Sequence, residues 1–164
     1  QVRDMLIFAR GEAPLNDDVT VTSLLEGISS AMEVPIAQSG AVCTLENQVG
    51  EAALMCNRDS LISAVMNLIN NALESCEHPI EIKLIARRDE QGRLCIAVMD
   101  NGPGLPTEKK NRMMEPFYTT KSNGTGLGLA VVQAVVRAHH GEFRLTDSPL
   151  GGVSAEMYLP LARG

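Results

Sequence analysis

The sequence is poor in aromatic residues, with no Trp, two Tyr and three Phe among 164 residues. A core without large rings must be filled by aliphatic side chains and by the eight Met residues, which adapt well to irregular packing. Hydrophobic residues make up 45% of the chain and charged residues 21%, which excludes an intrinsically disordered or low-complexity protein. Because domains commonly hold about 100–200 residues, the length indicates one domain.

The chain also lacks an excess of basic residues. Fourteen Lys and Arg residues face twenty Asp and Glu residues, which gives a net charge of −6. We therefore expect no nucleic-acid partner, since such a protein needs a basic surface to neutralise phosphates. The longest uncharged apolar run, around residues 126–136, is shorter than the about 20 residues of a membrane-spanning helix. We expect a soluble cytoplasmic module without direct membrane contact and, because it begins with Gln1, a fragment of a longer protein.

Metal-binding and nucleophilic motifs are absent as well. The cysteines are too far apart for a paired-Cys motif, and the histidines complete no metal-ligand spacing. No Ser, His, Asp triad or paired-carboxylate hydrolase site is recognisable. We expect reduced, mostly buried thiols, and we expect His139 and His140 to interact as cations with the C-terminal end of a helix. The residues concerned are Cys43, Cys56, Cys76, Cys95, His78, His139 and His140.

Hydrophobic periodicity predicts alternating helices and paired strands. Helices are expected from a cap at Thr22 or Ser23 to about Gln38, at 58–76 and at 126–139. Strands are expected at 19–21, at 41–46 and 53–56 around a polar turn, and in two hairpins, 80–88 with 93–99 and 142–146 with 153–159. The strands and helices do not follow a regular βαβ order. This favours a two-layer α/β sandwich, with a mixed β-sheet packed against about three helices.

The helix expected at 58–76 carries an unusual polar stripe. Its members fall within one arc of the helix, namely Ser60, Ser63, Asn67, Asn70, Asn71 and Glu74. Asn is a poor helix former, so three Asn residues on one face require a reason. Amide oxygens that face a ligand-bound Mg²⁺ would supply one, and a solvated polar face is the alternative.

A second motif follows the strand that ends at Asp100. The next residues, Asn101-Gly102-Pro103-Gly104, include two glycines that allow the backbone to approach a planar ligand. A carboxylate at this position can accept a hydrogen bond from an exocyclic amine such as that of adenine. A tight turn capped by the Asp side chain explains the same residues equally well.

A third motif, Gly124-Thr125-Gly126-Leu127-Gly128-Leu129, directly precedes an apolar helix. Glycines at a helix N-terminus expose N–H groups that can hold phosphate, although the motif is neither a P-loop nor a dinucleotide fingerprint. Lys121 could reach the outer phosphates with the Thr120 hydroxyl beside it, and a solvated loop lysine is the alternative. Residues 101–125 form a long irregular segment, with one short helix expected near 109–114, and a loop of that length is usually functional.

The order of these motifs is more specific than any one of them. An Asn-bearing helix, a strand ending in DxGxG, a loop with Glu115-Pro116-Phe117 and GTGLGL opening a helix resemble the N, G1, F and G2 boxes of the histidine-kinase catalytic domain. This is the Bergerat-fold ATPase group, shared with type II topoisomerases, mismatch-repair ATPases and the heat-shock 90 chaperones. The run at 115–121 is similar to nitrogen-regulation-type sensor kinases, which typically serve activators of sigma-54 promoters. A flagellar-regulatory kinase of that group is one candidate that this resemblance implies.

The resemblance implies a role for each matching residue. Asn71 would coordinate Mg²⁺, Asn67 would lie near the phosphates of ATP, and Asp100 would bind the adenine amine. Asn67 and Lys121 are the residues implied in catalysis. The further nucleotide contacts that it implies, including an ATP lid at 101–125, are Asn70, Gly102, Gly104, Phe117, Thr120, Lys121, Gly124, Thr125, Gly126, Leu127 and Gly128.

The resemblance also implies a reaction. Hydrolysing relatives generally carry a Glu where this chain has Asn67, and an amide cannot take a proton from water. We therefore expect slow hydrolysis and transfer of the γ-phosphoryl group to a histidine, for relay to a response regulator Asp. Two alternatives are a hydrolytic ATPase of the same fold and an anti-sigma-type ATP-dependent binding module.

The accepting histidine would lie on an upstream dimerisation domain, because no His of this chain has the family's context. Residues 1–13 are similar to the end of that domain with its linker, and residues 14–164 would form the catalytic domain. We expect a monomer for the isolated chain and a homodimer for the full-length protein.

Overall fold

The computed structural model describes residues 14–104, 108 and 128–162. The helices and strands of this part, in chain order, are β1 (Asp17–Thr20), α2 (Val21–Ser39), β2 (Val42–Asn47), β3 (Ala53–Cys56), α3 (Arg58–Ser75), β4 (Glu81–Arg88), β5 (Leu94–Asp100), α5 (Gly128–Ala138), β6 (Glu142–Asp147) and β7 (Val153–Leu159). No helix among the described residues is long and apolar enough to cross a membrane. Residues 1–13, which we expect to belong to an upstream helix and linker, lie outside the described residues.

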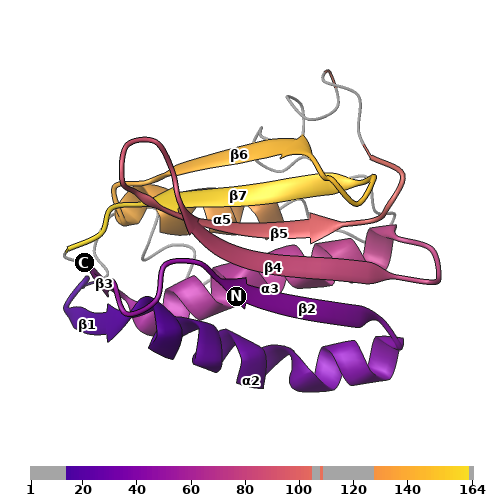
Figure 1. Cartoon of the computed structure of the whole chain (residues 1–164), viewed down its shortest axis with the longest axis horizontal. Helices are drawn as coiled ribbons and strands as arrows, with labels where there is room; N and C mark the ends of the chain where they lie inside the picture. Colours follow the sequence, from indigo (N-terminus) through magenta and orange to yellow (C-terminus); the bar gives the residue numbers. More distant parts are fainter. Residues whose placement is uncertain (1–13, 105–107, 109–127, 163–164) are drawn as a thin grey trace.

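The main sheet has five strands in the order β2-β4-β5-β7-β6. β2 and β4 are parallel, and the other neighbouring strands of the sheet are antiparallel. The helices α2, α3 and α5 lie on one side of this sheet, while β1 and β3 form a separate two-stranded ribbon beside it (Figure 1). The predicted two-layer α/β sandwich with a mixed sheet and three helices is confirmed.

The core lies between the sheet and the helices and is aliphatic. Alternate residues of the central strands point toward the helices, and Leu84, Ile96 and Met157 are fully buried there. Leu61 and Ile69 on α3 pack into the same cluster. This arrangement fixes α3 against the sheet.

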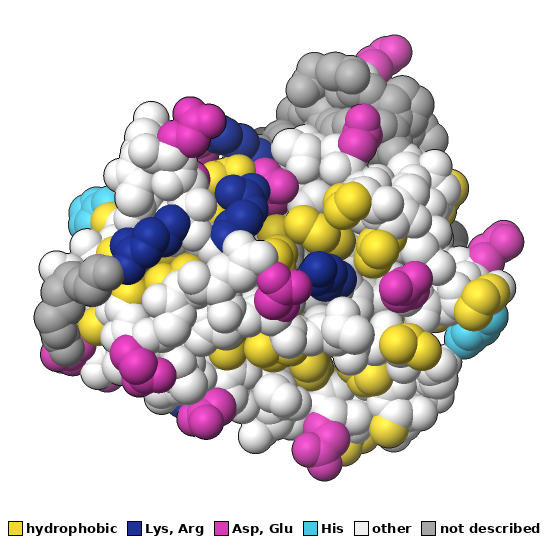
Figure 2. Space-filling model, viewed as in Figure 1, with side chains coloured by type: hydrophobic (Ala, Val, Ile, Leu, Met, Phe, Trp, Pro, Cys, Tyr) yellow, Lys and Arg dark blue, Asp and Glu magenta, His cyan; other side chains and the backbone are white. Residues whose placement is uncertain are grey.

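The opposite face of the sheet is covered by its own charged side chains, which stand among hydrophobic ones (Figure 2). The guanidinium carbons of Arg93 and Arg144 lie 5.1 and 4.6 Å from the centre of the Tyr158 ring. The Tyr158 hydroxyl donates a 2.7 Å hydrogen bond to Glu156, a buried carboxylate that also lies 3.7 Å from Arg87. Long charged side chains thus cover a small apolar strip on this face.

One local expectation near the N-terminus is wrong. Helix α2 is capped by Thr20, whose hydroxyl accepts the Ser23 N–H at 3.1 Å, and not by Thr22 or Ser23. The strands expected at 41–46 and 53–56 form as β2 and β3, and they do not pair with each other. β2 pairs with β4, and β3 pairs with β1. Each pairing joins strands that are far apart in the sequence, and local alternation of residues does not identify such partners.

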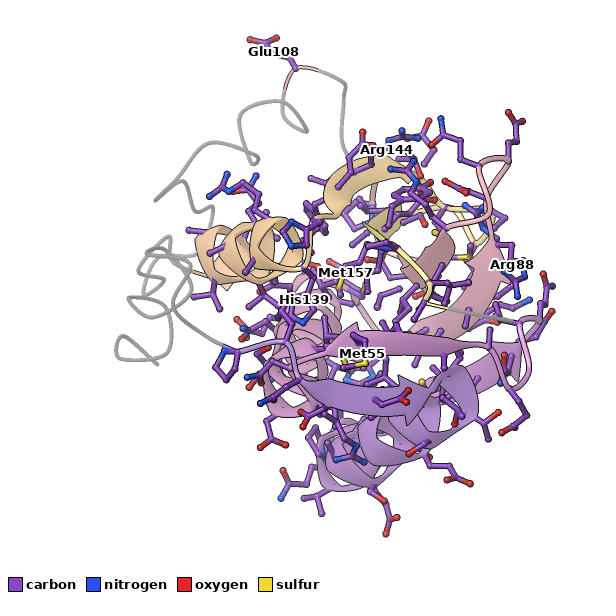
Figure 3. All side chains as sticks on the ribbon, turned by 90° about the vertical axis from the view of Figure 1, so that its left-hand side faces the viewer. Met55, Arg88, Glu108, His139, Arg144 and Met157 are labelled. Atoms are coloured by element: carbon purple, nitrogen blue, oxygen red, sulfur yellow. The ribbon has the colours of Figure 1, made fainter. Side chains whose placement is uncertain are left out.

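The His139 ring, which follows α5, is neutral and not cationic as predicted. His139 is 3% exposed, its Nδ1 lies 2.7 Å from the Val135 carbonyl, and its Nε2 accepts the Asn57 N–H at 2.9 Å. Burial lowers the pKa of this ring, which is neutral when Nε2 accepts a hydrogen bond. His139 is therefore a buried link between α5 and α3 (Figure 3), and the prediction of a cationic cap is wrong for it.

The residues after His139 end the helix. His140 adopts φ 62°, and the Gly141 N–H bonds the Val136 carbonyl, a Schellman arrangement. Gly141 follows this helix end and lies directly against β7. A β-carbon at Gly141 would overlap the carbonyl oxygen of Tyr158 on β7, so only glycine allows these two segments of the backbone to lie this close.

Candidate functional site

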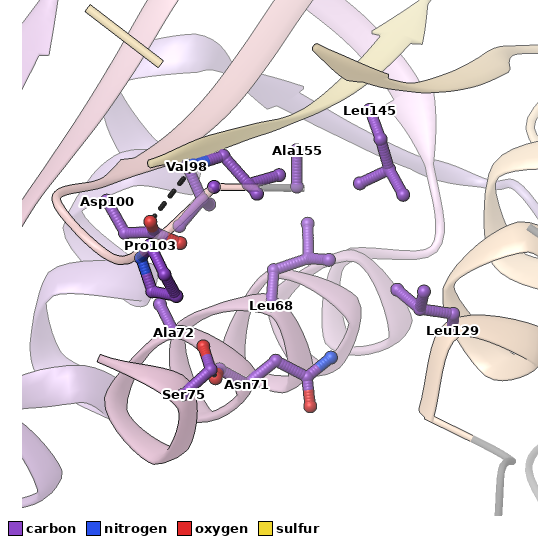
Figure 4. Close-up of a pocket in the computed structure, with 12 residues that line it drawn as sticks. Leu68, Asn71, Ala72, Ser75, Val98, Asp100, Pro103, Leu129, Leu145 and Ala155 are labelled. Atoms are coloured by element: carbon purple, nitrogen blue, oxygen red, sulfur yellow. Dashed lines mark hydrogen bonds between the residues drawn. The ribbon is translucent and has the colours of Figure 1, made fainter. Parts of the chain in front are cut away.

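A pocket that is partly open to solvent lies between α3, the end of β5 and the start of α5 (Figure 4). Most of its wall is aliphatic, and its polar side chains are those of Asn71, Ser75 and Asp100. The lining residues are Leu68, Asn71, Ala72, Ser75, Val98, Asp100, Pro103, Gly104, Leu129, Leu145, Val153 and Ala155. Three of the residues implied as nucleotide contacts are therefore brought together from two motifs, Asn71 from the polar stripe of α3 and Asp100 with Gly104 from the end of β5.

Asp100 is the best-fixed polar group of the pocket. Its side chain is 8% exposed, and its Oδ1 accepts two backbone hydrogen bonds, from the Gly102 N–H at 2.9 Å and from the Val153 N–H at 3.0 Å. The capped turn that the sequence left as an alternative is therefore present, and the same carboxylate also lines the pocket. Both backbone bonds use Oδ1, and neither uses Oδ2.

The turn between β6 and β7 supports Asp100, a contribution that the sequence analysis missed. The Gly152 N–H donates to the Asp100 carbonyl at 3.1 Å, and a β-carbon at Gly152 would overlap Asp100 Oδ1. Gly104 adopts φ +75° beside the carbonyl of Gly151. The pair Gly151-Gly152 in the expected hairpin turn was the available signal, but it does not tell a turn glycine from one that another loop approaches.

The amides of α3 lie in a more open environment than Asp100. Asn71 lines the pocket and is partly buried, Asn67 is partly buried without lining it, and Asn70 is exposed. Ser75 lies one turn after Asn71 and donates to the Asn71 carbonyl at 2.8 Å. Ser60 does not belong with these residues, because it is buried in the N-terminal cap and bonds Asn57.

The remaining expected residues belong mainly to the loop before α5. Seven of them, and the short helix expected near 109–114, lie outside the described residues, namely Phe117, Thr120, Lys121, Gly124, Thr125, Gly126 and Leu127. Gly128 is the first residue of α5, and Leu129 after it lines the pocket. The third glycine motif therefore leads into a helix that begins at the pocket, as expected.

The pocket suits a flat apolar ring that carries an amine. Leu68, Val98 and Ala155 supply apolar walls, and Asp100 offers a fixed hydrogen-bond acceptor at one end. Pockets of this composition, mostly apolar with a few placed polar groups, are typical of small-molecule and cofactor sites. Asn71 adds an amide at the pocket edge, where a polar part of the ligand would leave the apolar walls.

The fold and this pocket define a nucleotide-binding α/β sandwich, and comparison with known proteins gives its family. Residues 56–163 match the family described as histidine kinase-, DNA gyrase B-, and HSP90-like ATPase. The chain belongs to this family, and ATP is therefore the nucleotide of the domain.

Sensor kinases are among its relatives. The sensor protein kinase FleS of Pseudomonas aeruginosa is 46% identical over 163 residues, which cover 98% of this chain and 39% of FleS. The nitrogen regulation protein NtrY of Azorhizobium caulinodans is 40% identical over 101 residues, 58% of this chain and 13% of NtrY. The resemblance to histidine-kinase catalytic domains of the nitrogen-regulation type is confirmed, and the chain spans only about two fifths of FleS.

The fold comparison agrees. The crystal structure of full-length ShkA in complex with AMPPNP superposes with a TM-score of 0.79 at 24% identity, and the match covers 99% of this chain and 35% of ShkA. Because the sequence identity is low, this likeness supports the fold alone.

Proposed function

We propose that this chain is the catalytic domain of a two-component sensor histidine kinase, which binds ATP in the described pocket and passes its γ-phosphoryl group to a histidine. The observation that carries the proposal is the convergence of Asp100, fixed through Oδ1, and Asn71 in one pocket of a chain of this ATPase family.

In this proposal Asp100 recognises the adenine base. Its Oδ2 accepts a hydrogen bond from the adenine amine, while Gly102 and Gly104 shape the loop beside the ring. Val98 and Leu68 contact the faces and edge of the base. A carboxylate can only accept when ionised, so the site favours a base that donates at this position.

The amide side of α3 is assigned to the phosphates and Mg²⁺. Mg²⁺ prefers oxygen ligands, and the amide oxygen of Asn71 at the pocket edge fits that preference. When bound, the metal would neutralise charge on the phosphates. Asn67 and Asn70 would lie along the phosphates, and the assigned contacts of Phe117, Thr120, Lys121 and the glycine-rich motif complete this side.

Transfer rather than hydrolysis is the proposed outcome. Asn67 occupies the helix position where a general base would stand, and an amide cannot accept a proton from water. Glu74 is exposed near the C-terminal end of α3 and lies about two turns from Asn67. It is therefore too far away to replace such a base. The chain therefore holds the γ-phosphoryl group for another acceptor.

The acceptor and partners lie beyond this chain in the proposal. Residues 1–13 end an upstream dimerisation and histidine-phosphotransfer domain, and residues 14–164 form the catalytic domain. The phosphohistidine is relayed to an Asp of a response regulator in the cytoplasm, with a sigma-54-dependent activator as the preferred class. The isolated chain is a monomer, and the full-length protein is a homodimer.

The test is a calorimetric titration of the chain with ADP and a non-hydrolysable ATP analogue, with and without Mg²⁺, beside an assay of phosphate release from ATP. Binding with negligible release is the expected result. Absence of binding contradicts the proposal, and rapid release favours a hydrolytic ATPase. Phosphohistidine formation is then measured in the longer protein that includes the upstream domain, and phosphorylation of a sigma-system protein on Ser would instead favour the anti-sigma alternative.

A further inference from the structure

The thiol of Cys76 lies against the Asp100 carboxylate, where no motif assigns it a role. Cys76 is the C-terminal cap of α3, and its N–H bonds the Ala72 carbonyl at 3.1 Å. A β-carbon built on Gly102 would lie 2.9 Å from Cys76 Sγ and 3.2 Å from Asp100 Oδ1. Thiol and carboxylate therefore border the same narrow space at Gly102.

Cys76 meets Asp100 from outside the pocket. Asp100 lines the pocket, whereas neither Cys76 nor Gly102 does, although Ala72 and Ser75 on the same end of α3 do. The thiol thus helps to cover the carboxylate on the side that a ligand does not use.

The chemistry of the thiol suits this contact. Burial and then the negative charge of Asp100 raise the pKa of Cys76 to about 11, and the neighbouring Ser75 side chain and Asn101 backbone N–H oppose this rise only in part. The thiol therefore keeps its proton at neutral pH. A protonated thiol is a weak donor that can face a carboxylate without adding a second negative charge.

The other cysteines have no such neighbour in the described site. Cys56 and Cys95 are buried, and Cys43 is a partly buried residue of β2, with its Sγ 3.8 Å from the Met32 sulfur. None of these three lines the pocket. Cys43 therefore serves as a matched control, because it is a partly buried thiol of similar exposure class outside the site.

We infer that Cys76 is a positioning residue for adenine recognition, whose S–H group holds the Asp100 carboxylate so that Oδ2 faces the amine of the base. The inference rests on the proposed function, in which Asp100 reads adenine. It adds a residue that acts on the base only through Asp100. Its loss should therefore change the choice between bases more than it changes the stability of the fold.

The experiment compares the affinities of ADP and inosine diphosphate, which carries a carbonyl in place of the adenine amine. We expect Cys76→Ala to lower the ratio of ADP to inosine diphosphate affinity by about threefold or more, as for a lost hydrogen bond. Cys76→Ser, which keeps a donor, should retain the ratio within about twofold. Cys43→Ala should leave the ratio unchanged. A purely structural role would lower both affinities together, and Cys76→Val replaces the Ala variant if the latter does not fold.

The outcomes separate the two proposals. If the unmodified chain prefers ADP and Cys76→Ala or Cys76→Val keeps the full preference, the role of Cys76 is overturned while the proposed function stands. If the unmodified chain binds both diphosphates equally, the assignment of Asp100 to adenine fails, and the inference about Cys76 fails with it.

Discussion

The two ends of the pocket are built differently. At the end assigned to adenine, Asp100 is 8% exposed and is held by backbone N–H groups of the loop after β5 and of the start of β7. At the end assigned to phosphate and metal, Asn71 and Asn67 are partly buried and Asn70 is exposed on one helix. The first end is organised by the fold itself, whereas the second presents side chains to the solvent.

The difference follows from what each group must do without a ligand. A buried carboxylate needs hydrogen bonds from the protein, and the loop glycines let the backbone supply them. Amides near the solvent can bond water and exchange it for phosphate oxygens or a metal. Changes at the first end should therefore weaken every adenine ligand, and changes at the second end only those that carry phosphates.

The largest effect is expected at Gly152, whose added β-carbon would overlap Asp100 Oδ1. Gly152→Ala should displace the carboxylate and weaken ADP and adenosine alike, by about 30-fold or more, as for the loss of hydrogen bonds to a charged group. Calorimetric titration measures both ligands. The control is Gly92→Ala in the β4–β5 turn, which strains a φ of +78° with no atoms within 4 Å of the new carbon and should keep the affinity. Full ADP affinity in Gly152→Ala would show that the turn does not support the site.

Asp100→Asn should give the next largest effect, and it should reverse the choice of base. Because Oδ1 faces two N–H donors, the amide oxygen of Asn must take that position, and its NH₂ group then faces the pocket. We expect ADP to lose about tenfold or more in affinity and inosine diphosphate, with a carbonyl there, to bind better than ADP. Titrations with both diphosphates give the ratio. A variant that still prefers ADP would remove Asp100 from base recognition.

The sequence predicts the frame of this comparison well, because local patterns determine most of the elements. Periodicity places α3, and the hairpins β4–β5 and β6–β7 form where alternating residues flank turn residues. Asp100 and Asn71, which the family resemblance implied as nucleotide contacts, both line the pocket. The aliphatic core also follows directly from the lack of large rings.

The parts that the sequence does not predict depend on contacts between distant segments. The pairing of β2 with β4, the approach of Gly152 to Asp100 and the burial of His139 each join residues that are more than 30 positions apart. In each case the local sequence fits several environments equally well. A histidine after a helix, for example, looks the same whether it faces solvent or the cap of another helix.

Asn71→Ala tests the open end of the pocket. Its loss should weaken Mg²⁺ with the ATP analogue by about tenfold and leave adenosine within about twofold, since only the phosphates need the metal. Asn70→Ala, one position earlier and exposed, is the matched control and should have the smaller effect. The measurement is titration of each variant with adenosine and with the analogue plus Mg²⁺. Equal losses for both ligands would contradict the contrast between the two ends.

His139 should give the smallest effect on the site, because it lies at the far end of α5 from Leu129 and holds the start of α3 through the Asn57 N–H. Its pKa in the folded chain is below the ordinary 6.5, so the ring is neutral in both the folded and unfolded states at higher pH. As the pH falls below 6.5, the unfolded chain takes up the proton first, and stability is lost until the folded pKa is passed.

His139→Gln should cost about 1 kcal/mol at pH 7.5 and make the loss of stability between pH 7.5 and 5.5 shallower, as measured by urea unfolding. His140→Asn, which removes an exposed ring and tolerates φ 62°, should keep the steeper dependence. Equal pH dependence of stability in the unmodified chain and both variants would assign the acid sensitivity to other groups. A selective loss of ADP affinity in His139→Gln would show that His139 is coupled to the pocket through α5.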